Sequence, residues 1–248
     1  MIETPASIVA HLPSTLVLWD VDHTLIENGG VSKATYALAF ELLTGYTPSV
    51  RPTTDGRTGF QIMHELLSAN SVNAEKYVEI VQFEGVLVEA MEQNVSQLPQ
   101  RGHILPGVIK ALAALSAMPT VVQSVLTGNI FANALAKLRT FDLDKWVDLN
   151  VGGFGSDSKI RSNLVDTARR KVLKRYGMTF DQSSTILIGD TPLDVKAARD
   201  GGAKIVAVAT GVYSAEQLIE AGADVTLDSL ADLDCFIAAL IELRTGAC

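Results

Sequence analysis

Short apolar runs alternate with segments of helical period along most of this 248-residue chain. The apolar runs follow turn residues and have the length of strands, at 16–19, 121–126, 147–151, 185–188, 205–209 and 225–227. Segments that predict helices lie between the later runs, at 129–140, 162–176, 192–200 and 214–220. Strands that alternate with helices indicate a parallel sheet, so the predicted fold class is α/β with a doubly wound, Rossmann-like core.

The alternation is interrupted once, between the first and the second expected strand. A crossover between parallel strands needs only about a dozen residues, so this much longer gap must contain additional structure. Its apolar periodicity predicts helices at 31–44, 59–69 and 74–97. Gly29 and Gly30 open the gap, and Pro-Gln-Arg-Gly at 99–102 closes it. We therefore expect two domains, a core of residues 1–28 and 104–248 and an inserted helical domain of residues 29–103.

The composition narrows the classes of partner and location. The chain carries 20 Lys and Arg against 28 Asp and Glu, a formal charge of −8, which disfavours nucleic acid or an anionic membrane surface as a partner. Its two cysteines, Cys235 and Cys248, are too few for a disulfide framework or a zinc site. Residues 4–19 are uncharged but contain prolines and lack a basic flank, so neither a signal peptide nor a membrane span is expected. The predicted location is the cytoplasm.

Polar residues or glycines follow four of the expected strands, at the point where each strand ends. These segments are Asp20 to Asp22, Thr127 to Asn129, Gly152 to Gly155, and Gly189 to Asp194. Sites in open parallel sheets form beyond the carboxyl ends of the strands, so we expect the four segments to converge. Several carboxylates at one edge repel one another, and Mg²⁺, a hard cation that prefers oxygen ligands, would offset that repulsion.

The strand-end residues resemble the signature motifs of the haloacid dehalogenase-like phosphohydrolases. Asp20-Val21-Asp22-His23-Thr24 is similar to the DxDxT motif, Thr127-Gly128-Asn129 to the second motif, and 189–194 to the GDxxxD motif. The three motifs occur in the family's order, and the resemblance covers residues 14–28 and 104–230. It implies that the inserted helical domain is a cap, as in enzymes similar to phosphoglycolate phosphatases.

The resemblance also implies a role for each motif residue. Asp20 would attack phosphorus to form an aspartyl-phosphate, and Asp22 would protonate the leaving group and then activate water. Mg²⁺ would be held by Asp20, the backbone carbonyl of Asp22 and Asp190, with Asp194 in support. The phosphoryl oxygens would be bound by Thr127 and the amide of Gly128, beside Asn129.

The family's third motif supplies a basic side chain, usually a lysine, and here the sequence departs from the commonest Lys-Pro pattern. Lys159 and Arg161 are both candidates for this catalytic basic side chain. Arg161 is favoured because it precedes the first apolar position of the expected helix, Leu164, by three residues. Arg175, the last residue of the basic cluster at 169–175, lies about 20 Å further along the expected helix, and the cluster is interpreted as a solvated helix end.

The polar loop at 53–59 contains the remaining predicted substrate contact. Comparable cap loops in the family lie over the site, so Arg57 would bind a second anionic group of the substrate, such as a carboxylate. A solvated surface arginine in a turn is an equally good interpretation of the same residues.

The leading functional hypothesis is a Mg²⁺-dependent phosphatase acting on a small phosphorylated metabolite, such as a phosphoglycolate-like monoester. A phosphoglucomutase-like transferase has the same aspartates and remains an alternative, whereas dehalogenases lack the second aspartate. A non-catalytic phospho-acceptor or binding protein is a further alternative. Phospho-acceptor domains are shorter and have no helical insert, and the complete motif set argues against a chain without catalytic activity.

Overall fold

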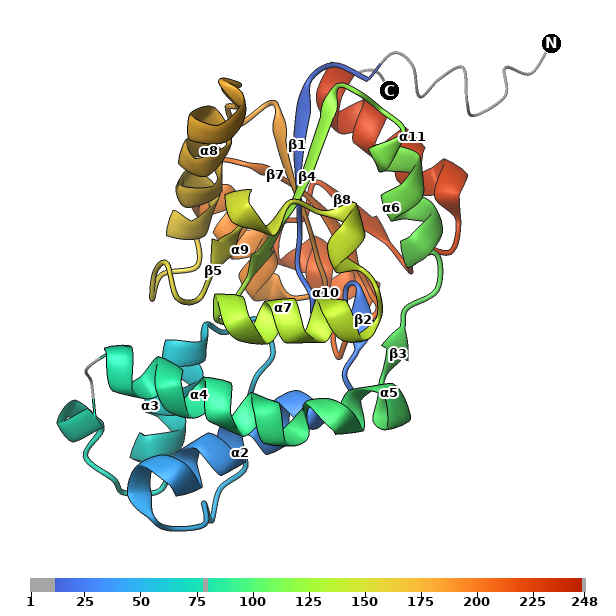
Figure 1. Cartoon of the computed structure of the whole chain (residues 1–248). Helices are drawn as coiled ribbons and strands as arrows, with labels where there is room; N and C mark the ends of the chain where they lie inside the picture. Colours follow the sequence, from blue (N-terminus) through green and yellow to red (C-terminus); the bar gives the residue numbers. More distant parts are fainter. Residues whose placement is uncertain (1–11, 78–79, 247–248) are drawn as a thin grey trace.

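A six-stranded parallel sheet forms the centre of the molecule, and the computed structural model describes residues 12–77 and 80–246 (Figure 1). The strand order is β5-β4-β1-β6-β7-β8. The strands are β1 (Thr15–Trp19), β4 (Val121–Thr127), β5 (Gly153–Phe154), β6 (Thr185–Gly189), β7 (Lys204–Val208) and β8 (Val225–Leu227). Every neighbouring pair is parallel, which confirms the α/β, doubly wound prediction.

Strand β1 lies in the interior of the sheet, and all five of its residues are buried. Val17 and Trp19 face one apolar cluster, while Leu16 and Leu18 face the other. A continuous apolar run is typical of a strand that is covered on both faces. The residue that follows β1 is therefore held at the sheet's carboxyl edge by a rigid, buried element.

Helices cover both faces of the sheet (Figure 1). One face packs against α6 (Val108–Ser116), α7 (Phe131–Thr140) and α11 (Leu233–Thr245). The other face packs against α8 (Asn163–Tyr176), α9 (Pro192–Asp200) and α10 (Ala215–Glu220). Within residues 12–77 and 80–246, no helix is both long and apolar enough to cross a membrane.

A second group of helices, which we call the helical insert, lies beyond the carboxyl ends of the strands (Figure 1). It comprises α2 (Val31–Thr44), α3 (Gly59–Ala69), α4 (Ile80–Asn94) and α5 (Leu98–Arg101), with 3₁₀ turns at Ala74–Tyr77 and Val95–Gln97. The expected helices at 31–44 and 59–69 are confirmed. The single helix expected at 74–97 is wrong, because the described part of that segment is divided among α4 and the two turns.

Two short strands join the helical insert to the rest of the chain. Strand β2 (Ile26–Glu27) pairs antiparallel with β3 (His103–Ile104), so both connections leave the core side by side. Gly29 and Gly30 adopt positive φ angles of 60° and 79° immediately before α2, a conformation that glycine reaches without strain. The predicted boundaries at 28/29 and 103/104 lie at this strand pair, and the division into two domains stays a prediction.

The strand expected at 147–151 is wrong. Leu149–Val151 form a 3₁₀ turn, and the pairing with β4 is made by β5 instead. The Asp148 side chain accepts a hydrogen bond from the amide of Asn150, which bends the chain into the turn. Leu149 and Val151 are buried all the same, so the apolar pattern alone did not distinguish a turn from a strand.

Candidate active site

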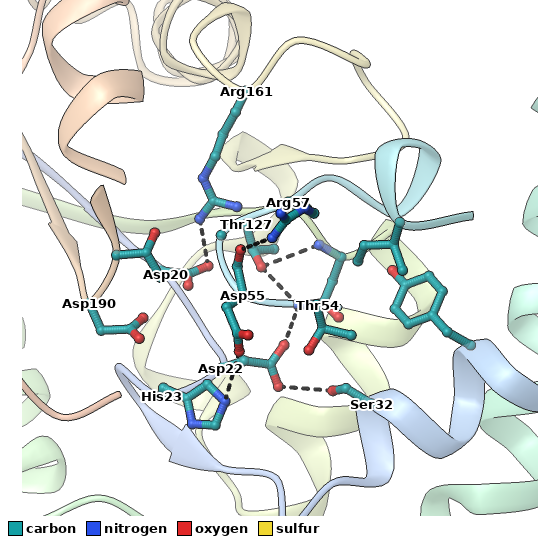
Figure 2. Close-up of a pocket in the computed structure, with 16 residues that line it drawn as sticks. Asp20, Asp22, His23, Ser32, Thr54, Asp55, Arg57, Thr127, Arg161 and Asp190 are labelled. Carbon is teal, nitrogen blue, oxygen red and sulfur yellow. Dashed lines mark hydrogen bonds and ion pairs between the residues drawn. The ribbon is translucent and has the colours of Figure 1, made fainter. Parts of the chain in front are cut away.

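Three strand ends meet at the carboxyl edge of the sheet and form a polar cavity (Figure 2). Asp20 follows β1, Thr127 ends β4, and Asp190 follows β6. Because β1 lies between β4 and β6, the segments that follow these strands are neighbours. The structure therefore brings together the predicted residues of all three strand ends, and it divides them into two environments.

The first environment, which we call the Asp20 cluster, contains Asp20, Asp190, Asp194 and Arg161. All four are nearly fully buried, and one carboxylate oxygen of each aspartate lies within 4.8 Å of the other two. A terminal guanidinium nitrogen of Arg161 lies 3.0 Å from Oδ1 of Asp20 and 2.5 Å from Oδ1 of Asp194. Two of the three carboxylates thus pair with one buried cation, and Asp190 lies beside them.

Burial dominates the electrostatics of the Asp20 cluster. It raises the pKa of Asp20 to about 6, although the positive charge of Arg161 opposes the shift. Burial and the neighbouring carboxylates of Asp194 and Asp20 also raise the pKa of Asp190. The folded chain therefore holds more negative charge here than Arg161 compensates.

The donor set of the Asp20 cluster fits a divalent metal ion. Oδ2 of Asp190 is buried and has no hydrogen-bond partner among the described residues. A Cβ on Gly211 would lie only 1.9 Å from that oxygen, so glycine leaves the space beside it. Asp194 has less to offer, because Arg161 occupies its Oδ1 and the amide and hydroxyl of Thr191 occupy its Oδ2. Asp20 and Asp190 are therefore the better metal ligands, as hard carboxylate oxygens.

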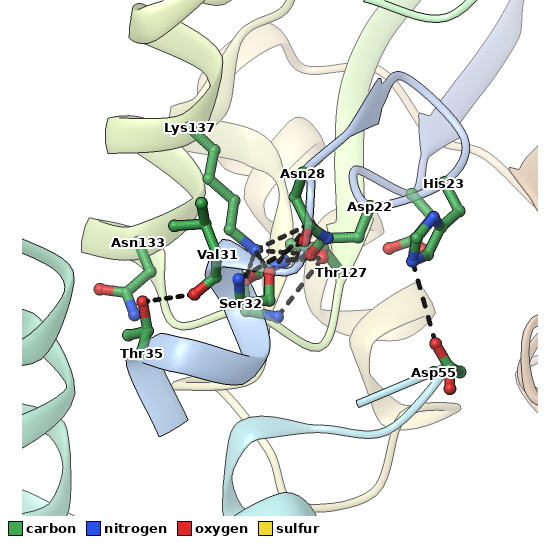
Figure 3. A network of polar contacts seen from close by, with 12 residues as sticks. Asp22, His23, Asn28, Val31, Ser32, Thr35, Asp55, Thr127, Asn133 and Lys137 are labelled. Atoms are coloured by element: carbon green, nitrogen blue, oxygen red, sulfur yellow. Dashed lines mark hydrogen bonds and ion pairs between the residues drawn. The ribbon is translucent and has the colours of Figure 1, made fainter. Parts of the chain in front are cut away.

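The second environment, which we call the Asp22 cluster, is built around a buried lysine (Figure 3). Nζ of Lys137, on α7, lies 2.6 Å from Oδ2 and 2.9 Å from Oδ1 of Asp22, and the lysine side chain is only 1% exposed. The same Nζ donates to Oγ of Ser32 and to Oδ1 of Asn129, each at 2.7 Å. The lysine charge is therefore fully hydrogen-bonded.

Further donors complete the coordination of the Asp22 carboxylate. Nδ2 of Asn129 donates to Oδ2 at 2.8 Å, Nδ2 of Asn28 to Oδ1 at 2.8 Å, and Oγ of Ser32 to Oδ1 at 3.2 Å. Burial alone would raise the pKa of Asp22, but the charge of Lys137 and these hydrogen bonds outweigh it and lower the pKa to about 2. Both carboxylate oxygens are engaged, so only the backbone carbonyl of Asp22 would be available to a metal.

The segment after β4 provides a tight backbone turn between the two clusters. The hydroxyl of Thr127 accepts hydrogen bonds from the amide and the side chain of Asn129. A Cβ on Gly128 would lie 1.9 Å from the carbonyl oxygen of Arg57 and 3.1 Å from a terminal nitrogen of Arg161. Only glycine fits at position 128, where the helical insert and the core meet.

Comparisons with known proteins give the same assignment as the strand-end motifs. A family model described as HAD-hydrolase-like matches residues 159–233, which include Arg161, Asp190 and Asp194. The protein named Probable phosphatase IndB, from Dickeya dadantii (strain 3937), is 25% identical over 234 residues, which cover 93% of this chain and 96% of that protein.

Solved structures of hydrolases share the fold. A hydrolase from Pseudomonas syringae matches with a TM-score of 0.64 at 20% identity, covering 90% of this chain and 97% of its own. A structure from Bacteroides vulgatus, provisionally assigned as a β-phosphoglucomutase, matches with a TM-score of 0.67 at 18% identity, covering 94% of this chain and 91% of its own. The chain is therefore similar to HAD-like hydrolases, through the matched segment 159–233 and the fold shared over most of its length.

Of the two candidates for the third HAD-like motif, Arg161 lines the cavity beside Asp20. Lys159 lies outside the cavity, with its Nζ 3.7 Å from the ring centre of Phe60. The two residues are two positions apart in the turn before α8, so their side chains point in different directions. Arg169, in the middle of α8, donates to the backbone carbonyls of Gly201 and Asp181, and none of the residues 169–175 lines the cavity.

Arg57 lies on the helical insert and lines the cavity. Its Nε lies 2.9 Å from Oε2 of Glu65, and another guanidinium nitrogen donates to the carbonyl of Asp55 at 3.2 Å. The segment 152–155, which contains β5 rather than being a loop throughout, borders the site, since the amide of Gly155 donates to the carbonyl of Asn129.

Sequence reasoning named Asn129 and Arg57, but it missed Lys137, Ser32 and Asn28 around Asp22 and Asp55 on the helical insert. Lys137 carried one available signal, because it lies among Ala134 and Leu138 on the apolar face of its helix. A lysine there is buried, and a buried lysine requires an anionic partner. The partner itself, 115 positions away, had no signal in the sequence.

Proposed function

We propose that this protein is a Mg²⁺-dependent phosphatase that hydrolyses a small phosphorylated metabolite through an aspartyl-phosphate at Asp20. The observation that carries the proposal is the Asp20 cluster, in which a buried carboxylate at a strand end lies beside Arg161 and two further aspartates. The name of the relative from Dickeya dadantii supports phosphate ester hydrolysis as the reaction. We also propose residues 29–103 as a cap, and the cytoplasm as the location.

In the first step, a carboxylate oxygen of Asp20 attacks phosphorus and the bond between phosphorus and the leaving oxygen breaks. Asp22 donates a proton to that oxygen. A phosphoryl group bound beside Asp22 brings negative charge, which raises the pKa of Asp22 and lets it carry the proton. The leaving group departs as an alcohol, and Asp22 is again a carboxylate.

In the second step, water attacks the phosphorus of the aspartyl-phosphate while Asp22 accepts a proton from it. The contacts from Lys137 and Asn129 favour the ionised form of Asp22, which suits this role as a base. The products are phosphate and the free Asp20 carboxylate. Mg²⁺, held by Asp20, Asp190 and the carbonyl of Asp22 with Asp194 in support, would neutralise charge on the phosphoryl group.

The phosphoryl oxygens lie, in this proposal, between Arg161 and the turn at Thr127 to Asn129. Nε of Arg161 has no hydrogen-bond partner among the described residues, so this donor is free for a phosphoryl oxygen. The glycine at position 128 lets the backbone approach an anion closely. Phosphoryl transfer depends mainly on such positioning and charge stabilisation.

A phosphoglucomutase-like transferase is the second candidate, and the structural likeness to the Bacteroides vulgatus protein favours it. The first step is then the same, but a sugar hydroxyl replaces water as the acceptor in the second step. Release of inorganic phosphate from p-nitrophenyl phosphate without any sugar present distinguishes the two candidates, since a transferase needs the acceptor.

We expect the purified protein to hydrolyse p-nitrophenyl phosphate with Mg²⁺ and to lose this activity when the metal is chelated. Asp20→Asn should lower kcat at least ~1000-fold, because the amide is not a nucleophile. Circular dichroism should show an unchanged fold. Asp166→Asn, on the exposed surface of α8, is the matched control. Turnover by Asp20→Asn at the level of this control would refute Asp20 as the nucleophile, and a silent wild type would favour a binding protein.

A further inference from the structure

The cavity has one face made by the helical insert, opposite Asp20. We call the residues Tyr36, Thr54, Asp55, Arg57 and Ile62 the insert face. A substrate whose phosphoryl group lies at Asp20 must direct its leaving group toward this face. The chemistry of the insert face therefore determines which leaving groups are accepted.

The cationic residue of the insert face is already paired. Arg57 contacts Glu65 through Nε and the carbonyl of Asp55 through a terminal nitrogen. A second anionic group on the substrate would have to replace the contact with Glu65. The structure thus weakens the expectation that Arg57 binds a substrate carboxylate.

Asp55 has the opposite property, since part of its carboxylate is buried and unpaired. Its Oδ1 has no hydrogen-bond partner among the described residues. The ring Nε2 of His23 lies 3.9 Å from that oxygen, within ion-pair distance but beyond hydrogen-bond distance (Figures 2 and 3). Nδ1 of the same ring is bonded to Glu27. A buried carboxylate oxygen without a donor is costly, and a donor on the substrate would satisfy it.

The position of Asp55 is fixed by the residues that follow it in the loop. Gly56 has a φ of +68°, and a Cβ there would lie 2.5 Å from Oγ1 of Thr191. The next carbonyl, of Arg57, packs against Gly128, and the amide of Gly59 donates to the Gly128 carbonyl at 2.8 Å. The loop is held against the core, so Asp55 is preorganised in the cavity.

We propose that Asp55 accepts a hydrogen bond from a hydroxyl group of the leaving group, so that the preferred substrates are phosphate monoesters of polyols or sugars. The inference rests on the proposed phosphatase function. An apolar leaving group would leave Oδ1 of Asp55 unpaired, and a carboxylate in the same place would be repelled by it. The proposal therefore disfavours phosphoglycolate-like substrates, because the carboxylate of the glycolate leaving group would face the carboxylate of Asp55.

The test compares two phosphate esters of equal chain length, glycerol 1-phosphate and propyl phosphate, with 2-phosphoglycolate as the acidic arm. We expect wild-type kcat/KM to be at least ~10-fold higher for glycerol 1-phosphate than for propyl phosphate. Asp55→Ala should reduce that ratio about 10-fold, and Asp55→Asn, which keeps an acceptor oxygen, should reduce it less. Thr53→Ala, an exposed position on the same loop, is the matched control and should keep the wild-type ratio.

Binding to the Asp20→Asn variant provides a readout that needs no turnover. Calorimetry with Mg²⁺ should give tighter binding of glycerol 1-phosphate than of propyl phosphate, and Asp55→Ala in this background should remove the difference. Equal losses for all three esters in Asp55→Ala would overturn the proposal, since Asp55 would then only hold the loop near His23. A wild-type preference for 2-phosphoglycolate would also overturn it. If the wild-type protein hydrolyses none of the esters, including p-nitrophenyl phosphate, the phosphatase function itself is refuted.

Discussion

Asp20 and Asp22 are two residues apart in the sequence, yet their surroundings shift their acidities in opposite directions. Burial raises the pKa of Asp20 to about 6, whereas the contacts with Lys137 and Asn129 overcome burial and lower the pKa of Asp22 to about 2. Asp20 shares a single cation with two other carboxylates, and Asp22 has a lysine and three neutral donors to itself. The two carboxyl groups therefore differ in pKa because of the residues from distant segments that surround them, and not because of the motif spacing.

The largest expected effect is on the Asp22 cluster. Lys137→Met removes the buried cation and leaves the Asp22 carboxylate without its main partner, which should lower the free energy of unfolding by about 3 kcal/mol. Urea denaturation measures this loss. Lys196→Met, at an exposed ion pair on α9, is the matched control and should lose much less.

A second substitution decides whether that loss comes from the unpaired charge. Asp22→Asn added to Lys137→Met should recover part of the stability, because the buried charge is then removed as well. Additive losses of stability in the double variant would contradict the role of Lys137 in compensating the charge of Asp22. A loss in Lys137→Met no larger than that of the Lys196→Met control would contradict it as well.

An effect of intermediate size is expected for pH dependence in the metal-free protein. Burial raises the pKa of Asp20 in the folded state, so the contribution of Asp20 to the free energy of unfolding falls as pH rises from about 4 through 6. The pKa of Asp22 is lowered in the folded state, so the stabilisation that Asp22 gives to the folded state is complete above pH 4. This stabilisation is lost as pH falls through 2.

The substitution Asp20→Asn isolates the pH dependence of stability that is due to Asp20. With a chelator present, we expect the variant to unfold at higher urea concentration than the wild type at pH 7, and at nearly the same concentration at pH 4. A variant that is less stable than the wild type at pH 7 would show that Asp20 is stabilised rather than strained by its neighbours.

The smallest expected effect is at Ser32, which sharpens the comparison by removing one of several donors. Ser32→Ala deletes the hydroxyl that contacts both Lys137 and Asp22, while the direct pair stays intact. A loss of about 1 kcal/mol in urea denaturation is expected. A loss as large as that of Lys137→Met would mean that Ser32, and not the lysine, organises the cluster.

The sheet and the strand-end residues were predictable because they follow from local signals. Apolar runs located β1, β4 and β6, and parallel topology then required Asp20, Thr127 and Asp190 to meet at one edge. The strand expected at 147–151 failed because the hydrogen bond from the Asn150 amide to the Asp148 side chain bends the chain there, which apolar periodicity does not register.

The environment of the site was not predictable for a different reason. Lys137 meets Asp22 across 115 positions, and Asp55 reaches the cavity only because its loop packs against Gly128 and Thr191. Such contacts depend on how helices and loops lie on the finished core. Single-residue patterns in the sequence contain no information about these distances.

The buried pair of Lys137 and Asp22 has a consequence for how sequences related to this one can diverge. Loss of Asp22 leaves the buried charge of Lys137 unpaired, and loss of Lys137 leaves Asp22, which is 22% exposed, without its main partner. Either cost is a substantial part of the stability of a folded domain, which is about 5–15 kcal/mol in total. Because Asp22 also transfers the proton in the proposed reaction, relatives that share the reaction should keep this aspartate, and we expect them to keep a cation at position 137 as well. A relative that keeps the aspartate but has an apolar residue at position 137 must place another cation in the same space.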